Sequence, residues 1–127
     1  MKKKITMILA VFILMTTHVY ALEQAEARKI KESVKSNQSV IIDIREKDEI
    51  ESGKLEIAKW FAMSKIYEDE KWLNSFTKLT KDKKVYLYCR SGSRAATVKR
   101  ILKKNGIDAV NIGGYSSLEN LFKTNSK

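Results

Sequence analysis

Residues 85–94 read Val85-Tyr86-Leu87-Tyr88-Cys89-Arg90-Ser91-Gly92-Ser93-Arg94. The first four side chains are apolar or aromatic without polar alternation, which predicts a strand that is covered on both faces, as in a parallel sheet. Apolar residues then recur at helical spacing and predict a helix from about Ala95 to Asn105. The sequence therefore places one cysteine and two arginines between the end of a buried strand and the start of a helix.

The segments around this stretch alternate between strands and helices. A β-branched run at Val40-Ile41-Ile42-Asp43-Ile44 predicts a second buried strand, and residues 108–112 predict another. A weaker pattern predicts a strand at 60–63. The spacing of apolar residues predicts helices over 23–35, 46–51, 72–79 and 118–122. This order of elements predicts an α/β fold with a parallel sheet.

The N-terminus carries the pattern of a secretory signal peptide. Lysines at positions 2–4 precede an apolar run of eleven residues, 5–15, and Val19-Tyr20-Ala21 supplies small residues where a signal peptidase cuts. An uncleaved membrane anchor is the alternative, but a spanning helix needs about 20 apolar residues. We therefore expect residues 1–21 to be a signal peptide and residues 22–127 to form the mature domain. We expect that domain to be exported to the periplasm, without stable membrane association.

Composition and charge limit the kinds of site and partner that this chain can have. The 127 residues suffice for one domain, and the formal charge of +10 favours small anionic partners. Cys89 is the one cysteine and His18 the one histidine, which excludes an intramolecular disulfide, a cysteine-rich zinc site and a cysteine–histidine pair in the mature domain. The basic excess is typical of a solvated surface, and we expect no nucleic-acid partner.

Cys89 follows a strand at the position where parallel sheets bind ligands. The backbone N–H groups of residues 90–94 and the start of the next helix favour an anion there. Arg90 and Arg94 add positive charge that favours the thiolate and can pair with oxyanions, and Gly92 allows a tight turn. The alternative interpretation is a cysteine that packs as a small apolar residue at a strand end.

Three parts of the sequence resemble the signatures of the rhodanese family of sulfurtransferases, specifically its small, single-domain exported members. They are an apolar strand ending in Asp43-Ile44-Arg45-Glu46, the loop Tyr86-Leu87-Tyr88-Cys89-Arg90-Ser91-Gly92-Ser93-Arg94, and the segments Asn105-Gly106-Ile107 and Val110-Asn111-Ile112-Gly113-Gly114. The resemblance implies a three-layer α/β domain with a central, mostly parallel five-stranded sheet flanked by helices.

The same resemblance implies a thiosulfate sulfurtransferase. Cys89 would take a sulfane sulfur from thiosulfate or a similar anionic donor, hold it as a persulfide, and pass it to cyanide or a thiol. The donor would be bound by the loop residues Arg90, Ser91, Gly92, Ser93 and Arg94. Asp43 and Arg45 are assigned a supporting role as a structural ion pair. We expect no metal, no organic cofactor and a monomeric chain.

Two departures from the family pattern and two rival functions accompany this interpretation. The residues after Gly53 are Lys54-Leu55-Glu56-Ile57 where the family usually has His, an aliphatic residue, Pro and Gly, and Leu118 stands where a Trp is usual. One rival is a non-catalytic rhodanese-like module that binds a partner, although such members commonly lack the cysteine. The other is a cysteine-dependent phosphatase or arsenate reductase. Cysteine phosphatases have His where Tyr88 precedes Cys89, and a loop longer by one residue.

Overall fold

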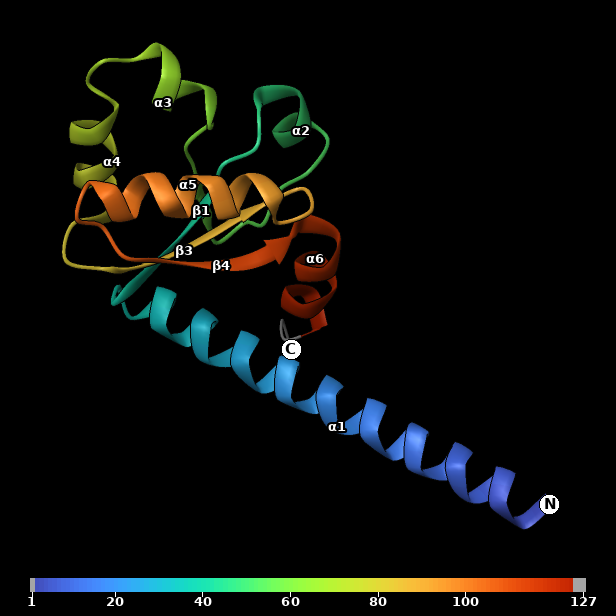
Figure 1. Cartoon of the computed structure of the whole chain (residues 1–127). Helices are drawn as coiled ribbons and strands as arrows, with labels where there is room; N and C mark the ends of the chain where they lie inside the picture. The colour runs from blue at the N-terminus through green and yellow to red at the C-terminus, as the bar shows by residue number, and fades with distance from the viewer. Residues whose placement is uncertain (1, 125–127) are drawn as a thin grey trace.

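The structure, a computed structural model, describes residues 2–124 and has three layers, with a sheet between two layers of helices (Figure 1). In chain order the elements are α1 (Lys2–Lys35), β1 (Ser39–Asp43), α2 (Lys47–Glu51), β2 (Ala58–Trp60), α3 (Ser64–Glu68), α4 (Trp72–Thr80), β3 (Lys84–Cys89), α5 (Ser93–Lys104), β4 (Ala109–Gly114) and α6 (Tyr115–Thr124). This alternation confirms the α/β class expected from the sequence.

The sheet has the order β2-β1-β3-β4, and every pair of neighbouring strands is parallel. Within residues 2–124 it contains four strands, so the five-stranded sheet implied by the family resemblance is wrong for this structure. The physical reason lies upstream of β1. No glycine or proline interrupts residues 2–35, so that whole segment is one helix and adds no strand to the sheet.

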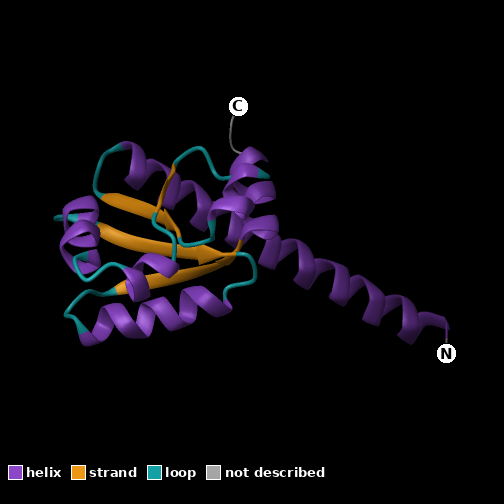
Figure 2. Cartoon of the chain, turned by 90° about the horizontal axis from the view of Figure 1, so that it is seen from above, coloured by secondary structure: helices purple, strands orange, loops and turns teal. Residues whose placement is uncertain are grey.

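Alternate side chains of the central strands enter two separate apolar clusters. Val40, Ile42 and Leu87 face the side that α4 and α5 cover, where Phe76 and Leu102 complete the cluster. Ile41, Tyr86 and Tyr88 face the opposite side, where they meet α1 and α6. Figure 2 shows these helices on both faces of the strands. Covering on both faces is why β1 and β3 lack polar alternation.

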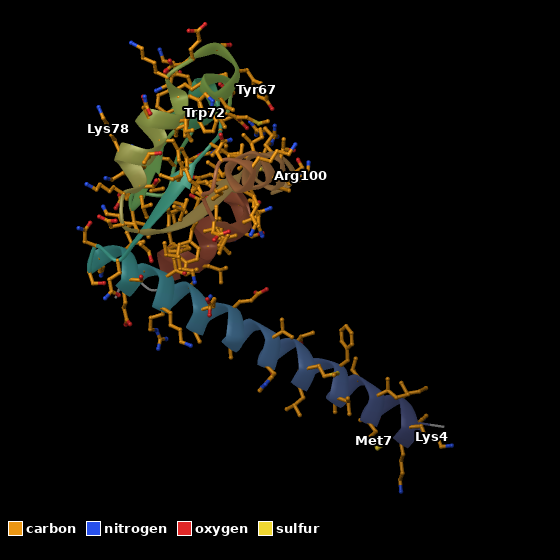
Figure 3. All side chains as sticks on the ribbon, turned by 60° about the vertical axis from the view of Figure 1, so that its left-hand side comes forward. Lys4, Met7, Tyr67, Trp72, Lys78 and Arg100 are labelled. Atoms are coloured by element: carbon orange, nitrogen blue, oxygen red, sulfur yellow. The ribbon has the colours of Figure 1, made fainter. Side chains whose placement is uncertain are left out.

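Helix α1 has two parts with different surroundings. Ala27 and Ile30 are buried against the domain, whereas the large apolar side chains between Ile5 and Val19 are more than half exposed. In Figure 3 the outer part, labelled at Met7, extends away from the domain. Among the described helices, α1 is long and apolar enough to cross a membrane, because an 18-residue window of it has a mean hydropathy of 2.0. Secretory signal sequences share these properties.

Three sequence predictions need correction in detail. The weak strand expected at 60–63 lies at Ala58–Trp60. Trp60 is 39% exposed, although tryptophan is a residue type typical of the core, and its indole N–H donates to the Arg45 carbonyl over 2.8 Å. The strand expected at 108–112 lies at Ala109–Gly114, so it includes the glycine pair at 113–114. Helix α3, at Ser64–Glu68, was not predicted from the sequence.

Candidate active site

Cys89 is the last residue of β3, at the carboxyl end of the sheet, and its side chain is buried. The backbone N–H of Gly92 donates to Cys89 Sγ over 3.0 Å. Gly92 has a φ of 95°, which side chains rarely adopt, and it is the N-cap of the 12-residue helix α5. The sulfur therefore lies beside a backbone amide and the positive end of a helix, and both favour a negative charge on it.

The end of β4 supports the loop from the other side. The Asn111 side-chain amide donates to the Gly92 carbonyl over 2.9 Å, and the Gly113 N–H donates to the Asn111 side chain over 3.0 Å. A Cβ atom on Gly114 would lie 2.5 Å from the Arg90 carbonyl oxygen, so a glycine is needed at 114 for this close approach. Sequence reasoning identified this segment as a signature but assigned it no role at the loop.

Arg94 lies close to the loop but is engaged by a carboxylate. Its Nη1 and Nη2 atoms donate to Glu49 Oε2 and Oε1 over 2.8 and 2.6 Å. Hydrogen bonding to Arg94 is the main cause that lowers the pKa of Glu49 to about 2. Sequence reasoning assigned Arg94 to the donor and missed Glu49, which comes from α2 and is 45 residues away in the sequence.

A pocket of about 680 Å³ opens next to the loop. Arg90 and Ser91, two of the predicted donor-binding residues, are exposed and contribute to its lining. Ser93 is also exposed, and its hydroxyl lies 3.1 Å from that of Ser91. The complete lining among the described residues is Arg45, Asp48, Glu49, Ser52, Arg90, Ser91, Tyr115 and Ser116. Arg94 is therefore beside the pocket and outside its lining.

Asp43 and Arg45 form a buried ion pair beneath this pocket. Arg45 Nη2 donates to Asp43 Oδ2 over 2.8 Å and to the Gly53 carbonyl over 2.7 Å. The Tyr88 hydroxyl donates to Asp43, and burial followed by this hydrogen bond raises the pKa of Tyr88, which therefore stays protonated as a donor. The Arg45 guanidinium also lies 4.1 Å from the centre of the Tyr115 ring. These contacts connect the loop after β1 to β3 and to the start of α6.

The comparison with known families agrees with this geometry. The family model described as Rhodanese-like domain matches residues 24–121. The chain belongs to the rhodanese-like domain family. This match covers most of the chain and includes β1, the Cys89 loop and β4.

Relatives of this rhodanese-like domain carry sulfurtransferase names. A Schizosaccharomyces pombe protein named "Putative thiosulfate sulfurtransferase, mitochondrial" is 38% identical over 85 residues, which are 61% of this chain and 58% of that protein. The chain thus spans little more than half of the length of that relative. A Bacillus subtilis protein named "Putative sulfurtransferase YtwF" is 29% identical over 94 residues, 73% of this chain and 85% of that protein.

Solved structures show the same fold. SSP1007 from Staphylococcus saprophyticus is 30% identical and superposes with a TM-score of 0.57, covering 72% of this chain and 88% of that one. A rhodanese-like domain protein from Staphylococcus aureus is 36% identical and superposes with a TM-score of 0.52. The match covers 63% of this chain and 72% of the Staphylococcus aureus chain.

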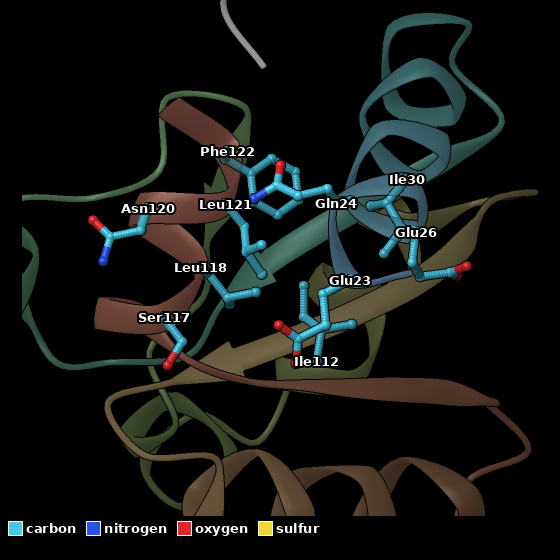
Figure 4. A pocket seen from close by; sticks show the side chains of 11 residues that line it. Glu23, Gln24, Glu26, Ile30, Ile112, Ser117, Leu118, Asn120, Leu121 and Phe122 are labelled. Atoms are coloured by element: carbon cyan, nitrogen blue, oxygen red, sulfur yellow. The ribbon is translucent and has the colours of Figure 1, made fainter. Parts of the chain in front are cut away.

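Leu118, which stands at the usual Trp position of the rhodanese-like family, lies away from the Cys89 loop. It is buried with Ile30 and Phe122 on the other face of the sheet, where Figure 4 shows it in a second pocket of about 490 Å³ between α1 and α6. The aromatic side chain in the lining of the active-site pocket is Tyr115. Its place directly after the Gly113-Gly114 pair is the sequence signal that could have identified it.

Proposed function

We propose that this rhodanese-like domain is a thiosulfate sulfurtransferase in which Cys89 carries the sulfur as a persulfide. The observation that carries the proposal is the position of Cys89 Sγ, 3.0 Å from the Gly92 N–H and next to the start of α5. A backbone N–H and a helix N-terminus stabilise negative charge, and the thiolate is the nucleophilic form of cysteine. The sulfurtransferase names of two relatives support the same reaction class.

The reaction has two balanced halves. The Cys89 thiolate attacks the outer sulfur of thiosulfate, a new S–S bond forms, and sulfite leaves with the electron pair of the broken S–S bond. Cyanide or a thiolate then attacks the outer sulfur of the persulfide, takes it as thiocyanate or a new persulfide, and returns the Cys89 thiolate. The Gly92 amide and the helix start stabilise the charge on sulfur at each stage.

Export of the domain to the periplasm is part of this proposal. The large apolar side chains between Ile5 and Val19 are exposed, and Ala27 is the first described side chain of α1 that is buried. Removal of residues 1–21 after Ala21 would therefore leave the buried contacts of α1 in place. Intact-mass measurement on protein from the exporting host tests this, and membrane-bound material that retains Met1 would refute it.

Mass spectrometry tests the sulfur chemistry directly. After thiosulfate treatment the chain should gain one sulfur atom, and cyanide or a thiol should remove it. Cys89→Ser should abolish the gain, because a hydroxyl cannot form the persulfide. Full turnover by Cys89→Ser would refute the proposal. A folded chain that never gains sulfur would favour the partner-binding module, and hydrolysis of an aryl phosphate would favour the phosphatase.

A further inference from the structure

We propose that Glu49 determines which arginine binds the donor anion. Its carboxylate neutralises Arg94 and leaves Arg90 to bind the anion. The inference rests on the proposed sulfurtransferase function and changes the sequence-based assignment of both arginines to the donor. Glu49 acts here as a specificity-determining residue that does not itself touch the donor sulfur.

The first observation is the form of the Glu49–Arg94 contact. Two nitrogen atoms of Arg94 meet both carboxylate oxygens of Glu49, at 2.6 and 2.8 Å. Bidentate pairs of this kind are among the strongest and most directional hydrogen bonds in proteins. The two side chains are 31% and 19% exposed, so water and salt screen the pair only in part. The pair carries no net charge, with Glu49 in the pocket lining and Arg94 outside it.

The second observation is that a hydrogen bond from the backbone at the start of α2 fixes the Glu49 carboxylate. Its Oε2 atom also accepts the Glu46 N–H over 2.9 Å. The Glu46 carboxylate in turn accepts the Ser64 N–H and hydroxyl, over 3.0 and 2.8 Å. These bonds connect the start of α2 to the start of α3. Because Glu49 is anchored on this side, the ion pair fixes the position of the Arg94 guanidinium beside the pocket and outside its lining.

Arg90 has the opposite surroundings. Its side chain is exposed and belongs to the pocket lining, whereas Arg94 does not. In the part of the chain that the structure describes, no carboxylate lies within ion-pair distance of the Arg90 guanidinium. Its backbone is positioned by the close approach of Gly114 to the Arg90 carbonyl oxygen. Arg90 therefore offers an uncompensated positive charge to a dianion in the pocket.

A double-mutant cycle separates this proposal from direct donor binding by Arg94. Thiosulfate binding is measured by amide chemical shifts of residues 90–94 in the Cys89→Ser chain, which cannot transfer sulfur. Arg94→Gln leaves the Glu49 carboxylate unpaired beside the pocket, and thiosulfate should bind about tenfold more weakly. Glu49→Gln leaves the Arg94 charge unpaired, and binding should tighten by about the same factor. The double variant should return to within about twofold of the parent Kd, because the removed pair was neutral.

Two controls complete the cycle. Arg90→Gln should weaken thiosulfate binding at least about tenfold whether or not the Glu49–Arg94 pair is present. Lys103→Gln removes one positive charge from the far end of α5, where Lys103 pairs with Asp108 over 3.0 Å. Because that site is exposed, the Kd should stay within about twofold of the parent value at 0.15 M salt.

Several outcomes would overturn the inference. If the double variant binds thiosulfate as weakly as Arg94→Gln, Arg94 contacts the donor directly. If Glu49→Gln weakens binding, Glu49 acts mainly by holding the loop in place. Should the double variant not fold, the charge-swapped chain Glu49→Arg with Arg94→Glu retains an ion pair, and its Kd should match the parent within about threefold. The cycle measures binding in a chain that cannot transfer sulfur. A wild-type chain that never gains sulfur would therefore refute the proposed function, whereas the Kd values of the cycle test only the role of Glu49.

Discussion

The buried ion pair under the loop should respond strongly to Asp43→Asn. This change keeps the shape of the side chain but removes the negative charge that faces Arg45. Asp43 and Arg45 side chains are 2% and 5% exposed, and Arg45 donates to Asp43 through Nε and Nη2 over 3.1 and 2.8 Å. Removing one partner of a buried pair leaves an uncompensated charge, which costs about 3–5 kcal/mol.

That cost is large for a domain of this size. Domains of this kind are stable by only about 5–15 kcal/mol, so Asp43→Asn should remove a substantial part of the free energy of unfolding. The corresponding fall in Tm is at least about 12 °C. Replacing both residues, as Asp43→Leu with Arg45→Met, should cost less than Asp43→Asn, because no buried charge then remains unpaired.

Urea unfolding followed by tryptophan fluorescence measures these differences. Trp60 is a suitable reporter, because its indole N–H donates to the Arg45 carbonyl. Glu51→Gln is the matched control, since Glu51 and Lys47 form an exposed pair 3.9 Å apart and its loss should cost less than about 1 kcal/mol. A loss below about 1 kcal/mol for Asp43→Asn would refute the reasoning, because the pair would then be as weak as a surface contact.

Three other perturbations test contacts around the loop. Arg94 lowers the pKa of Glu49 from 4.5 to about 2, so the Glu49 carboxylate stabilises the folded state fully above pH 4.5 and loses this effect as the pH falls toward 2. In Glu49→Gln the free energy of unfolding should therefore change less with pH between 4.5 and 2 than in the parent chain. Gly114→Ala should slow sulfur loading, because its Cβ meets the Arg90 carbonyl, whereas Gly106→Ala, with no atom within 4 Å, should affect stability only. Cys89 is fully buried, so a bulky aromatic disulfide should react far more slowly with the native chain than with the urea-unfolded chain, and equal rates would contradict the burial.

The strands that carry the site were predictable because their signal is local. Residues 40–44 are apolar except for Asp43, residues 85–88 are apolar or aromatic throughout, and the structure places β1 and β3 there in parallel pairing. The strand predicted at 60–63 begins two residues earlier and ends three residues earlier, at Ala58–Trp60. Trp60 looks like a core residue by type, but its indole N–H binds the Arg45 carbonyl at the surface. The prediction of a fifth strand came from the family resemblance. It was wrong because residues 2–35 form one uninterrupted helix.

By itself, the sequence determined the α/β class, the rhodanese-like family and the position of Cys89 at a strand end before a helix. These depend on neighbouring residues, whose spacing can be read along the chain. Only the tertiary structure decided which charges meet. Glu49 reaches Arg94 because α2 and α5 both begin at the carboxyl edge of the sheet, and Asn111 reaches Gly92 because β4 lies beside β3. Arg90 and Arg94 look equivalent in the sequence, and the fold gives a carboxylate partner to one of them and leaves the other exposed to the pocket.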